Sequence, residues 1–231
     1  MSGIQPARKK KDIEKMFNSI ASGYDLTNTL LSLGTDRIWR KRLVKELRPL
    51  NPVIIADIAT GTGKLAGLMA KKLNAEVHGI DISEKMLEIA KNKFPNLNFI
   101  KADGESIPFP DMHFDALTIS FGIRNFENPV TGLHEALRVI KTNGNIAILE
   151  FSQPSNNLWG KLFKFYFRKF IPFAGKILTG NKNAYTYLNK TALTFTSGNA
   201  FIELLKECGF KDNKQIRLTG GIATLYIGRK P

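Results

Sequence analysis

The stretch VIIADIATGTGKLAGLMAKKL, residues 53–73, decides the fold of this chain. Its first seven residues are β-branched or small apart from Asp57, a pattern typical of a strand that is buried on both faces. Residues 60–63, TGTG, supply two glycines that allow a tight turn and a close approach of the backbone to a ligand. The apolar positions of 65–73 then predict a helix. A strand, a glycine-rich turn and a helix in this order predict the first unit of a parallel α/β sheet.

The same alternation continues along the chain. Further strands are predicted at 76–81, 97–103, 114–122 and 145–151. Further helices are predicted at 12–19, 36–47, 83–94 and 128–141. Ser83 and Asn128 are favourable N-cap residues for the last two of these helices, and Pro129 suits the first helical position.

After Phe151 the alternation stops until Ser197, which we predict to cap a helix over 201–210. Two strands follow at 214–218 and 222–228, and the short TGG link between them requires an antiparallel pair. The fold class predicted from this order is α/β, with a Rossmann-like, doubly wound and mostly parallel sheet whose last strand is antiparallel.

Composition is compatible with one domain and with an intracellular protein. With 43% apolar residues the chain can bury a core, and its single cysteine, Cys208, rules out an internal disulfide and fits a reducing compartment. The N-terminus lacks the apolar segment of a signal peptide, and no run is apolar enough to span a membrane. We therefore expect a cytoplasmic protein. The predicted single domain, 1–231, has four parts: an N-terminal helical cap (1–50), a cofactor-binding core (51–152), an aromatic and basic lid (153–196), and a terminal helix with a strand pair (197–231).

The net charge of +14 indicates an anionic partner. Half of this charge, seven Lys or Arg residues without any Asp or Glu, falls between residues 151 and 202. Within it, LWGKLFKFYFRKFIPFAGKIL (158–178) carries seven aromatic and five basic residues. On a helix the basic residues share one side and aromatic residues cover most of the rest, a pattern typical of helices that lie on an anionic membrane. The alternatives are an ordinary roof over the active site and an RNA-stacking platform; the amphipathic pattern argues against RNA, so no nucleic acid is expected.

The glycine-rich turn is compatible with two classes of cofactor. Gly61-x-Gly63-x-x-Ala66 matches the dinucleotide fingerprint and would serve a nicotinamide cofactor, or it is a plain strand–helix turn. Asp57 favours a different ligand, because a carboxylate suits an ammonium and a sulfonium better than a pyrophosphate. Asp81 can accept hydrogen bonds from both ribose hydroxyls, and Asp103-Gly104 is placed to contact adenine. Together with the antiparallel terminal pair, these residues predict an S-adenosylmethionine site.

Several segments also carry a family resemblance: FNSIASGYDLTN (17–28), SLGTDRIWR (32–40), SFGIRN (120–125) and the run 138–152. They resemble the UbiE/MenG family of quinone-biosynthesis C-methyltransferases, for which the F-G-[IL]-R-N and Y-D-x-x-N patterns are specific. The likeness covers nearly the whole chain. It departs from the family at Asn18 and Lys64, where Asp is common, and at Asp36, where His is frequent. The resemblance implies a class I methyltransferase fold, S-adenosylmethionine as cofactor and methylation of a ring carbon on a polyprenylated quinol.

The expected cofactor site combines the glycine-rich turn with the ends of the following strands. Its residues are Asp57, Thr60, Gly61, Thr62, Gly63, Asp81, Ile82, Asp103, Gly104 and Ser120. No metal site is predicted, because the three histidines show no ligand spacing with cysteine or acidic residues.

Three further residues are candidates for catalysis. A neutral quinol is a weak nucleophile, and if its hydroxyl has a pKa of about 10, ionising it at pH 7 costs about 4 kcal/mol. Arg124 can stabilise the phenolate but cannot act as a base. Asn125 can hold the second oxygen or a water, and Tyr24 can close the pocket. Each has a structural alternative: a surface pair for Arg124, a turn for Asn125 and a core position for Tyr24.

The predicted reaction is methylation of demethylmenaquinol to menaquinol, because Thr60 stands where some members of the family carry glycine. Methylation of a polyprenyl-methoxybenzoquinol in ubiquinone synthesis is the alternative. Two other classes are disfavoured: another small-molecule or RNA methyltransferase, and a lipid- or quinone-binding protein without catalysis. The expected partners are the quinol and, transiently, the anionic inner face of the cytoplasmic membrane; a homodimer is compatible with the sequence.

Overall fold

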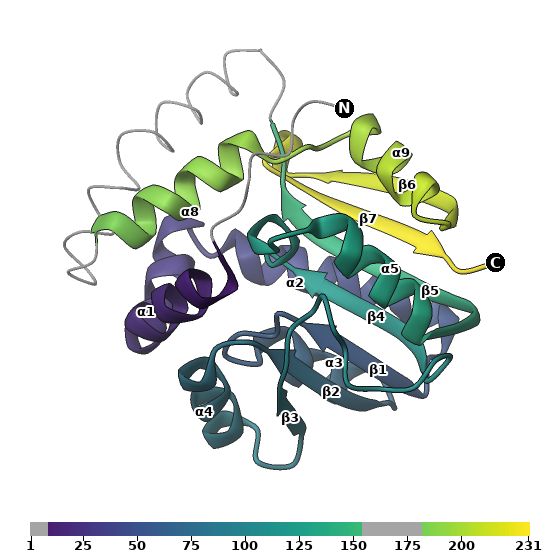
Figure 1. Cartoon of the computed structure of the whole chain (residues 1–231), viewed down its shortest axis with the longest axis horizontal. Coiled ribbons are helices and arrows are strands. Elements are labelled where there is room, and N and C mark those ends of the chain that lie inside the picture. The colour runs from purple at the N-terminus through teal and green to yellow at the C-terminus, as the bar shows by residue number, and fades with distance from the viewer. Residues whose placement is uncertain (1–8, 154–181) are drawn as a thin grey trace.

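The computed structural model describes residues 9–153 and 182–231 of the chain (Figure 1). The aromatic and basic run 158–178 lies outside the described residues, as does most of the predicted lid. The helices are α1 (Lys10–Leu31), α2 (Thr35–Leu47), η1 (Arg48–Leu50), α3 (Lys64–Lys72), α4 (Glu84–Lys93), η2 (Ile123–Asn125), α5 (Pro129–Val139), α8 (Lys182–Thr194), α9 (Asn199–Glu207) and η4 (Thr219–Gly221). The strands are β1 (Ile54–Ile58), β2 (Glu76–Asp81), β3 (Asn98–Lys101), β4 (Phe114–Ser120), β5 (Ile140–Phe151), β6 (Lys211–Leu218) and β7 (Ala223–Arg229).

The strands form one sheet in the order β3-β2-β1-β4-β5-β7-β6. Strand β1 pairs in parallel with β2 on one side and with β4 on the other, and β4 pairs in parallel with β5. Strand β7 is antiparallel both to β5 and to β6. The predicted parallel sheet with an antiparallel last strand is therefore confirmed. Because the order reverses between β1 and β4, the carboxyl ends of these two strands border a crevice, where ligands of such sheets bind.

Helices cover both faces of the sheet. On one face, α2, α3 and α4 bury Trp39, Leu43 and Met69 against the apolar side chains of the strands. On the other face, α5 and α9 bury Leu133 and Phe201 in a second cluster. Strands buried on both faces are mostly apolar, which is why β1 is apolar apart from Asp57.

Helices α1 and α8 lie side by side at one end of the sheet rather than on a face (Figure 1). Met16 and Ile20 of α1 share a small apolar cluster with Met86 of α4 and Leu188 of α8. Within the described ranges, 9–153 and 182–231, none of the helices combines the length and the apolar character required to cross a bilayer.

Helix α1 continues to Leu31, so the predicted end at Ser19 was wrong. Local sequence favours an early end because Ser22 and Gly23 are poor helix formers. Ile20 and Ala21 are nevertheless buried against α4 and α8, and this packing outweighs the local preference.

The predicted cap of α9 was also wrong. Gly198 occupies the N-cap position with φ +71°, and no side chain caps the helix. The backbone N–H of Gly198 instead donates a 2.7 Å hydrogen bond to the Tyr226 hydroxyl, so the sheet supplies the partner that Ser197 was expected to provide. The described helix α8 lies within 153–196, the segment predicted to be an inserted amphipathic helical lid, although the helix expected there was placed earlier, within 158–171. In contrast, Ser83 caps α4 as predicted, with its hydroxyl accepting from Met86 N at 3.3 Å.

Asn128 caps α5, which supports the loop that carries Arg124 and Asn125. Its Oδ1 accepts hydrogen bonds from the backbone N–H groups of Val130 and Thr131 at 3.1 and 3.3 Å. We expect Asn128→Ala to lower the free energy of unfolding by about 1 kcal/mol, because both donors lose their partner. Urea denaturation measures the change, and Asn128→Ser, which keeps an oxygen acceptor, serves as the control. Equal midpoints for Asn128→Ala and the unaltered protein would contradict this role for the cap.

Candidate active site

A cleft of about 690 Å³, including its open mouth, lies at the carboxyl ends of β1, β2 and β4. Helix α1 forms its opposite wall. Most of the predicted site residues line this cleft: Tyr24, Gly61, Asp81, Ile82, Asp103, Gly104, Ser120 and Asn125. The structure thus brings together residues separated by about a hundred positions in the sequence. The predicted residues Asp57, Thr60, Thr62, Gly63 and Arg124 are not among those that line the cleft.

The glycine-rich turn presents open backbone to the cleft. Gly61 has φ +57°, and a Cβ built there would meet no atom within 4 Å. Gly63 has φ +76°, where a Cβ would press against the ring of Phe99 at 3.0 Å. The turn therefore needs Gly63 for its own geometry, whereas the space beside Gly61 can be filled by a ligand.

Asp81 joins this turn to the end of β2. Its Oδ2 accepts a hydrogen bond from Gly61 N at 2.7 Å, and its Oδ1 accepts one from Ser83 N at 2.8 Å. Burial raises the pKa of Asp81 to about 6, and the backbone N–H donors offset this effect only in part. A carboxylate held in this way lines the cleft with lone pairs available to hydroxyl donors.

Asp57 lies behind the turn. Its side chain is buried, and its two oxygens accept hydrogen bonds from the hydroxyls of Thr60 and Thr118, both at 2.7 Å. Burial raises the pKa of Asp57 to about 6, against the lowering effect of these two hydroxyls. The contacts show Asp57 fixing the base of the turn, and its pairing with a ligand ammonium remains a prediction.

The adenine end of the expected site is tightly packed. Gly104 has no room for a side chain, because a Cβ there would meet Phe126 at 2.6 Å and Ile58 at 2.7 Å. Asp103 pairs with Lys10 at 2.5 Å, so the start of α1 reaches this end of the cleft. Lys10 was not a sequence candidate, because nothing in the local sequence places a residue near the N-terminus beside Asp103.

Arg124 is almost fully buried and paired. Its Nη1 donates to Glu150 Oε1 at 2.6 Å and to the carbonyl oxygen of Phe121 at 2.7 Å. Glu150 is fully buried, and burial raises its pKa, although the neighbouring Arg124 acts to lower it. The surface pair considered for Arg124 is therefore an interior pair. The sequence did not indicate Glu150 as a site residue, because its partner Arg124 lies 26 positions earlier, in the loop after β4.

Burial and a nearby positive charge act in opposite directions on the pKa of the Tyr24 phenol in the cleft wall. Burial raises the pKa of Tyr24, while the positive charge of Arg124 acts in the opposite direction. Arg124 therefore acts on a phenol that lines the cleft, although the guanidinium itself does not line it.

Two buried polar atoms of the cleft have no hydrogen-bond partner within the described parts of the chain: Ser120 Oγ and Asn125 Oδ1. Buried polar groups are rarely left without partners, so these atoms are suited to bind a ligand or a water. With the open space at Gly61 and the carboxylate of Asp81, they fit the polar groups of S-adenosylmethionine. Phe121, with φ +57°, also lines the cleft, although the sequence indicated it only as part of the SFGIRN segment and not as a site residue.

Comparison with known proteins extends over nearly the full chain. Residues 5–230 match the ubiE/COQ5 methyltransferase family. A demethylmenaquinone methyltransferase of Thermotoga maritima is 39% identical over 223 residues, which span 96% of this chain and 97% of that protein. A demethylmenaquinone methyltransferase of Bacteroides fragilis is 40% identical over 230 residues, or 96% and 94% of the two chains. A ubiquinone/menaquinone biosynthesis C-methyltransferase of Citrifermentans bemidjiense is 42% identical over 232 residues, or 97% and 98%.

Solved structures share the fold at much lower identity. An S-adenosylmethionine-dependent methyltransferase of Thermotoga maritima is 19% identical and superposes with a TM-score of 0.70 over 94% of this chain and 99% of its own. The [4+2]-cyclase SpnF is 17% identical, with a TM-score of 0.71 over 100% and 99%. Because one of these two is described as a cyclase, the fold by itself does not establish the reaction.

The raised pKa of Asp81 predicts pH-dependent cofactor binding. Hydroxyl donors prefer the ionised carboxylate, so below pH 6 binding must first remove a proton from Asp81. We expect the Kd for S-adenosylhomocysteine to be constant between about pH 7 and 8, and to rise about tenfold for each pH unit below about 6. Titration calorimetry measures it.

Asp81→Asn is the control for this effect. It should bind the ligand weakly at every pH, and any slope that remains reports Asp57, which titrates in the same range. A Kd for the unaltered protein that stays flat down to pH 5 would contradict the role of Asp81.

Proposed function

The chain belongs to the ubiE/COQ5 methyltransferase family, and we propose that it methylates a ring carbon of demethylmenaquinol to give menaquinol. The chain is a methyltransferase that uses S-adenosylmethionine in quinone biosynthesis. The observation that carries the choice of substrate is the near full-length identity, 39% and 40%, with two demethylmenaquinone methyltransferases. A polyprenyl-methoxybenzoquinol is the second candidate, favoured by the 42% identical relative that is named for both quinones.

The cleft residues suit the parts of the cofactor. Asp81 would accept hydrogen bonds from the ribose hydroxyls, and Asp103 with Gly104 would border the adenine. Gly61 would bring backbone close to the methionine portion, with the Ser120 hydroxyl as a further partner. When bound, S-adenosylmethionine supplies the methyl group on a sulfonium.

Arg124 would stabilise the phenolate form of the quinol. Its positive charge already acts to lower the pKa of Tyr24, a phenol in the cleft wall. Glu150 holds this guanidinium through a 2.6 Å hydrogen bond and so fixes its direction. A phenolate would direct negative charge onto the adjacent ring carbon, which would gain the methyl group and then pass its hydrogen, as a proton, to water.

Asn125 and Tyr24 would position the substrate. The unpartnered Oδ1 of Asn125 can accept a hydrogen bond from the second quinol hydroxyl or from a water. Tyr24, on α1, would close the cleft above the ring, and burial keeps its hydroxyl protonated at neutral pH by raising its pKa. Holding donor and acceptor in line can supply roughly 7–11 kcal/mol without any acid or base.

We also propose that the protein contacts the inner face of the cytoplasmic membrane, where a polyprenylated quinol resides. The support comes from the sequence alone: the run 158–178 pairs seven aromatic with five basic residues and contains no acid. Each basic residue near an anionic surface contributes about 1 kcal/mol.

The substrate is tested with radiolabelled S-adenosylmethionine and two quinols in anionic liposomes. We expect label in demethylmenaquinol, because the two relatives named for that substrate align over nearly the whole chain. Polyprenyl-methoxybenzoquinol is the matched alternative, and oxidised demethylmenaquinone is the control, since it lacks the hydroxyl that forms a phenolate. Label in neither quinol, with the cofactor bound, would overturn the proposed substrate.

Arg124→Ala is expected to lower kcat about 100-fold or more while leaving the Kd for S-adenosylhomocysteine nearly unchanged, because the guanidinium acts on the developing charge. The substitution leaves the buried Glu150 without its partner, which destabilises the protein. Arg124→Ala with Glu150→Gln removes that unpaired charge and should restore stability without restoring kcat. Equal losses in kcat and in cofactor affinity would contradict the phenolate role.

A further inference from the structure

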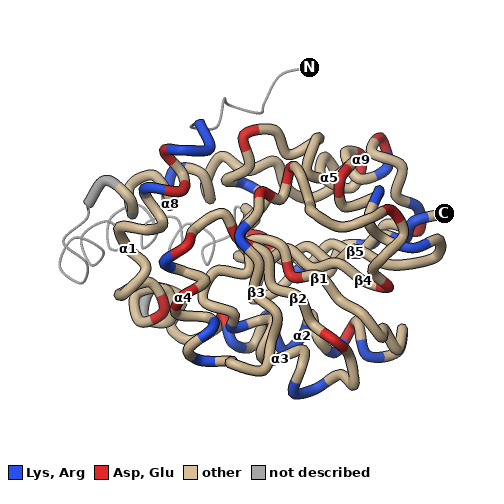
Figure 2. Tube along the Cα trace, turned by 60° about the horizontal axis from the view of Figure 1, so that its bottom comes forward, with Lys and Arg blue, Asp and Glu red and all other residues tan. Residues whose placement is uncertain are grey.

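Helix α1 forms one wall of the cleft and contributes four of the residues that line it. Polar contacts hold α1 at successive loops around the site. Lys10 pairs with Asp103 at the adenine end, and Asn18 Oδ1 accepts a 2.8 Å hydrogen bond from the Ser83 hydroxyl after β2. Asp25 makes the third contact, with the glycine-rich turn. Figure 2 shows acidic and basic residues near one another where α1 meets the rest of the chain.

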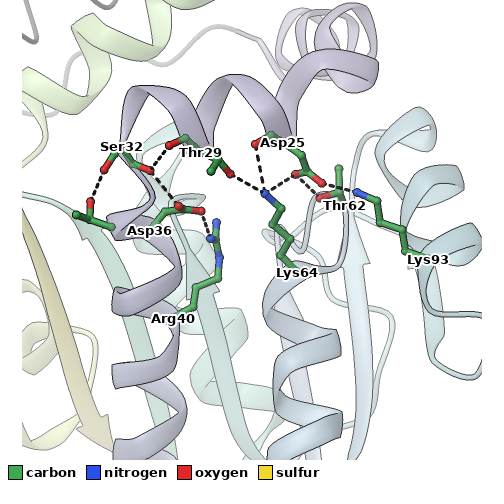
Figure 3. Close-up of polar contacts among 9 residues, drawn as sticks. Asp25, Thr29, Ser32, Asp36, Arg40, Thr62, Lys64 and Lys93 are labelled. Atoms are coloured by element: carbon green, nitrogen blue, oxygen red, sulfur yellow. Dashed lines mark hydrogen bonds and ion pairs between the residues drawn. The ribbon is translucent and has the colours of Figure 1, made fainter.

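The Asp25 carboxylate gathers three partners from three elements (Figure 3). Its Oδ1 accepts a 2.7 Å hydrogen bond from the Thr62 hydroxyl of the glycine-rich turn and lies 3.3 Å from Lys64 Nζ at the start of α3. Its Oδ2 pairs with Lys93 at the end of α4. Burial acts to raise the pKa of Asp25, but the bonds to Lys93 and Thr62 outweigh it and hold the pKa below its usual value. The carboxylate is therefore charged throughout the neutral range.

The start of α3 lacks the features that normally stabilise a helix N-terminus. Its N-cap is Gly63, no side chain caps it, and its first turn contains no acidic residue. Lys64 places a positive charge at this end, which the helix dipole disfavours. Asp25, which lies on α1, places a negative charge at the start of α3, next to the glycine-rich turn.

Lys64 binds α1 at more than the carboxylate. Its Nζ also lies 3.3 Å from the carbonyl oxygen of Asp25 and 3.3 Å from Thr29 Oγ1 (Figure 3). The family to which the sequence is similar commonly has Asp at this position, and a carboxylate there would repel Asp25. In this chain Lys64 occupies that position and forms an attractive contact between α3 and α1.

We infer that Asp25 is a positioning residue for the cofactor: it clamps α1 to the glycine-rich turn through Thr62 and so fixes the backbone that receives the ligand. The inference rests on the proposed cofactor but not on the identity of the quinol. Thr62 immediately follows Gly61, so loss of the clamp frees the open part of the turn. It also frees the half of α1 that carries Tyr24.

The test compares S-adenosylhomocysteine affinity among full-length variants by titration calorimetry. Asp25→Asn is expected to raise the Kd about tenfold or more, the effect of one hydrogen bond to a charged group. Thr62→Val, which removes only the hydroxyl donor, should raise it similarly. Since both act through one contact, the double variant should bind no more weakly than Asp25→Asn alone.

Glu14→Gln is the matched control. Glu14 lies on the same helix, is similarly exposed at 28% against 22% for Asp25, and pairs with Lys101 at 3.0 Å without touching the glycine-rich turn. We expect its Kd to stay within about twofold of the unaltered protein, because exposed ion pairs contribute little. Urea denaturation midpoints are measured for all variants. A higher Kd with an unchanged midpoint indicates a loss of positioning, whereas a lower midpoint indicates a general loss of structure.

Two outcomes would overturn the inference. One is an equal rise in Kd for Asp25→Asn and Glu14→Gln. The other is independent, multiplying effects of Asp25→Asn and Thr62→Val, which would mean that the two side chains do not act through their mutual bond. The binding measurements contain no quinol. If demethylmenaquinol proves not to be the substrate, the Kd comparisons therefore still test the role of Asp25.

Discussion

The buried carboxylate of Asp81 connects the two loops on which the site depends. It accepts hydrogen bonds from Gly61 in the turn after β1 and from Ser83 in the turn after β2. The arrangement costs stability in the ligand-free protein, because burial raises the pKa of this carboxyl to about 6 from 3.8. A raised folded-state pKa stabilises the protein below about pH 4, and that stabilisation is lost as the pH rises through about 6. A ligand that donates hydroxyl groups to Asp81 offsets the loss, so the site favours occupancy at neutral pH.

A buried ion pair, between Arg124 of η2 and Glu150 of β5, lies behind the residues that line the cleft. Interior pairs contribute little to stability unless every polar atom is satisfied, and here Arg124 Nε and Glu150 Oε2 have no partner among the described residues. A purely structural role is therefore a poor explanation for the pair. In the proposed reaction, the pair would hold a guanidinium whose direction and charge are fixed before the substrate arrives, which would avoid reorganisation during the reaction.

Two of the departures from the family pattern, Lys64 and Asp36, lie on α3 and α2. Lys64 departs from the family pattern, and the structure shows why the change is tolerated: Asp25 faces it from α1. Asp36, another of the three departures noted, is buried and held by Arg40 at 2.5 Å and by the Ser32 hydroxyl at 3.0 Å (Figure 3). Both side chains are thus held by contacts outside the cleft, Asp36 within the N-terminal cap and Lys64 between α3 and α1.

The sequence by itself determined the parallel sheet, its antiparallel last strand, and the cleft residues Gly61, Asp81 and Asp103, because these follow from local patterns and from the ends of strands that share one edge. It could not determine the length of α1, the cap of α9 or the partners of Asp25 and Arg124. Those depend on contacts between residues far apart in the chain: Asp25 lies 37 positions from Thr62 and Arg124 lies 26 from Glu150. Only the tertiary structure brings such pairs within hydrogen-bonding distance, where burial strengthens the attraction between their charges.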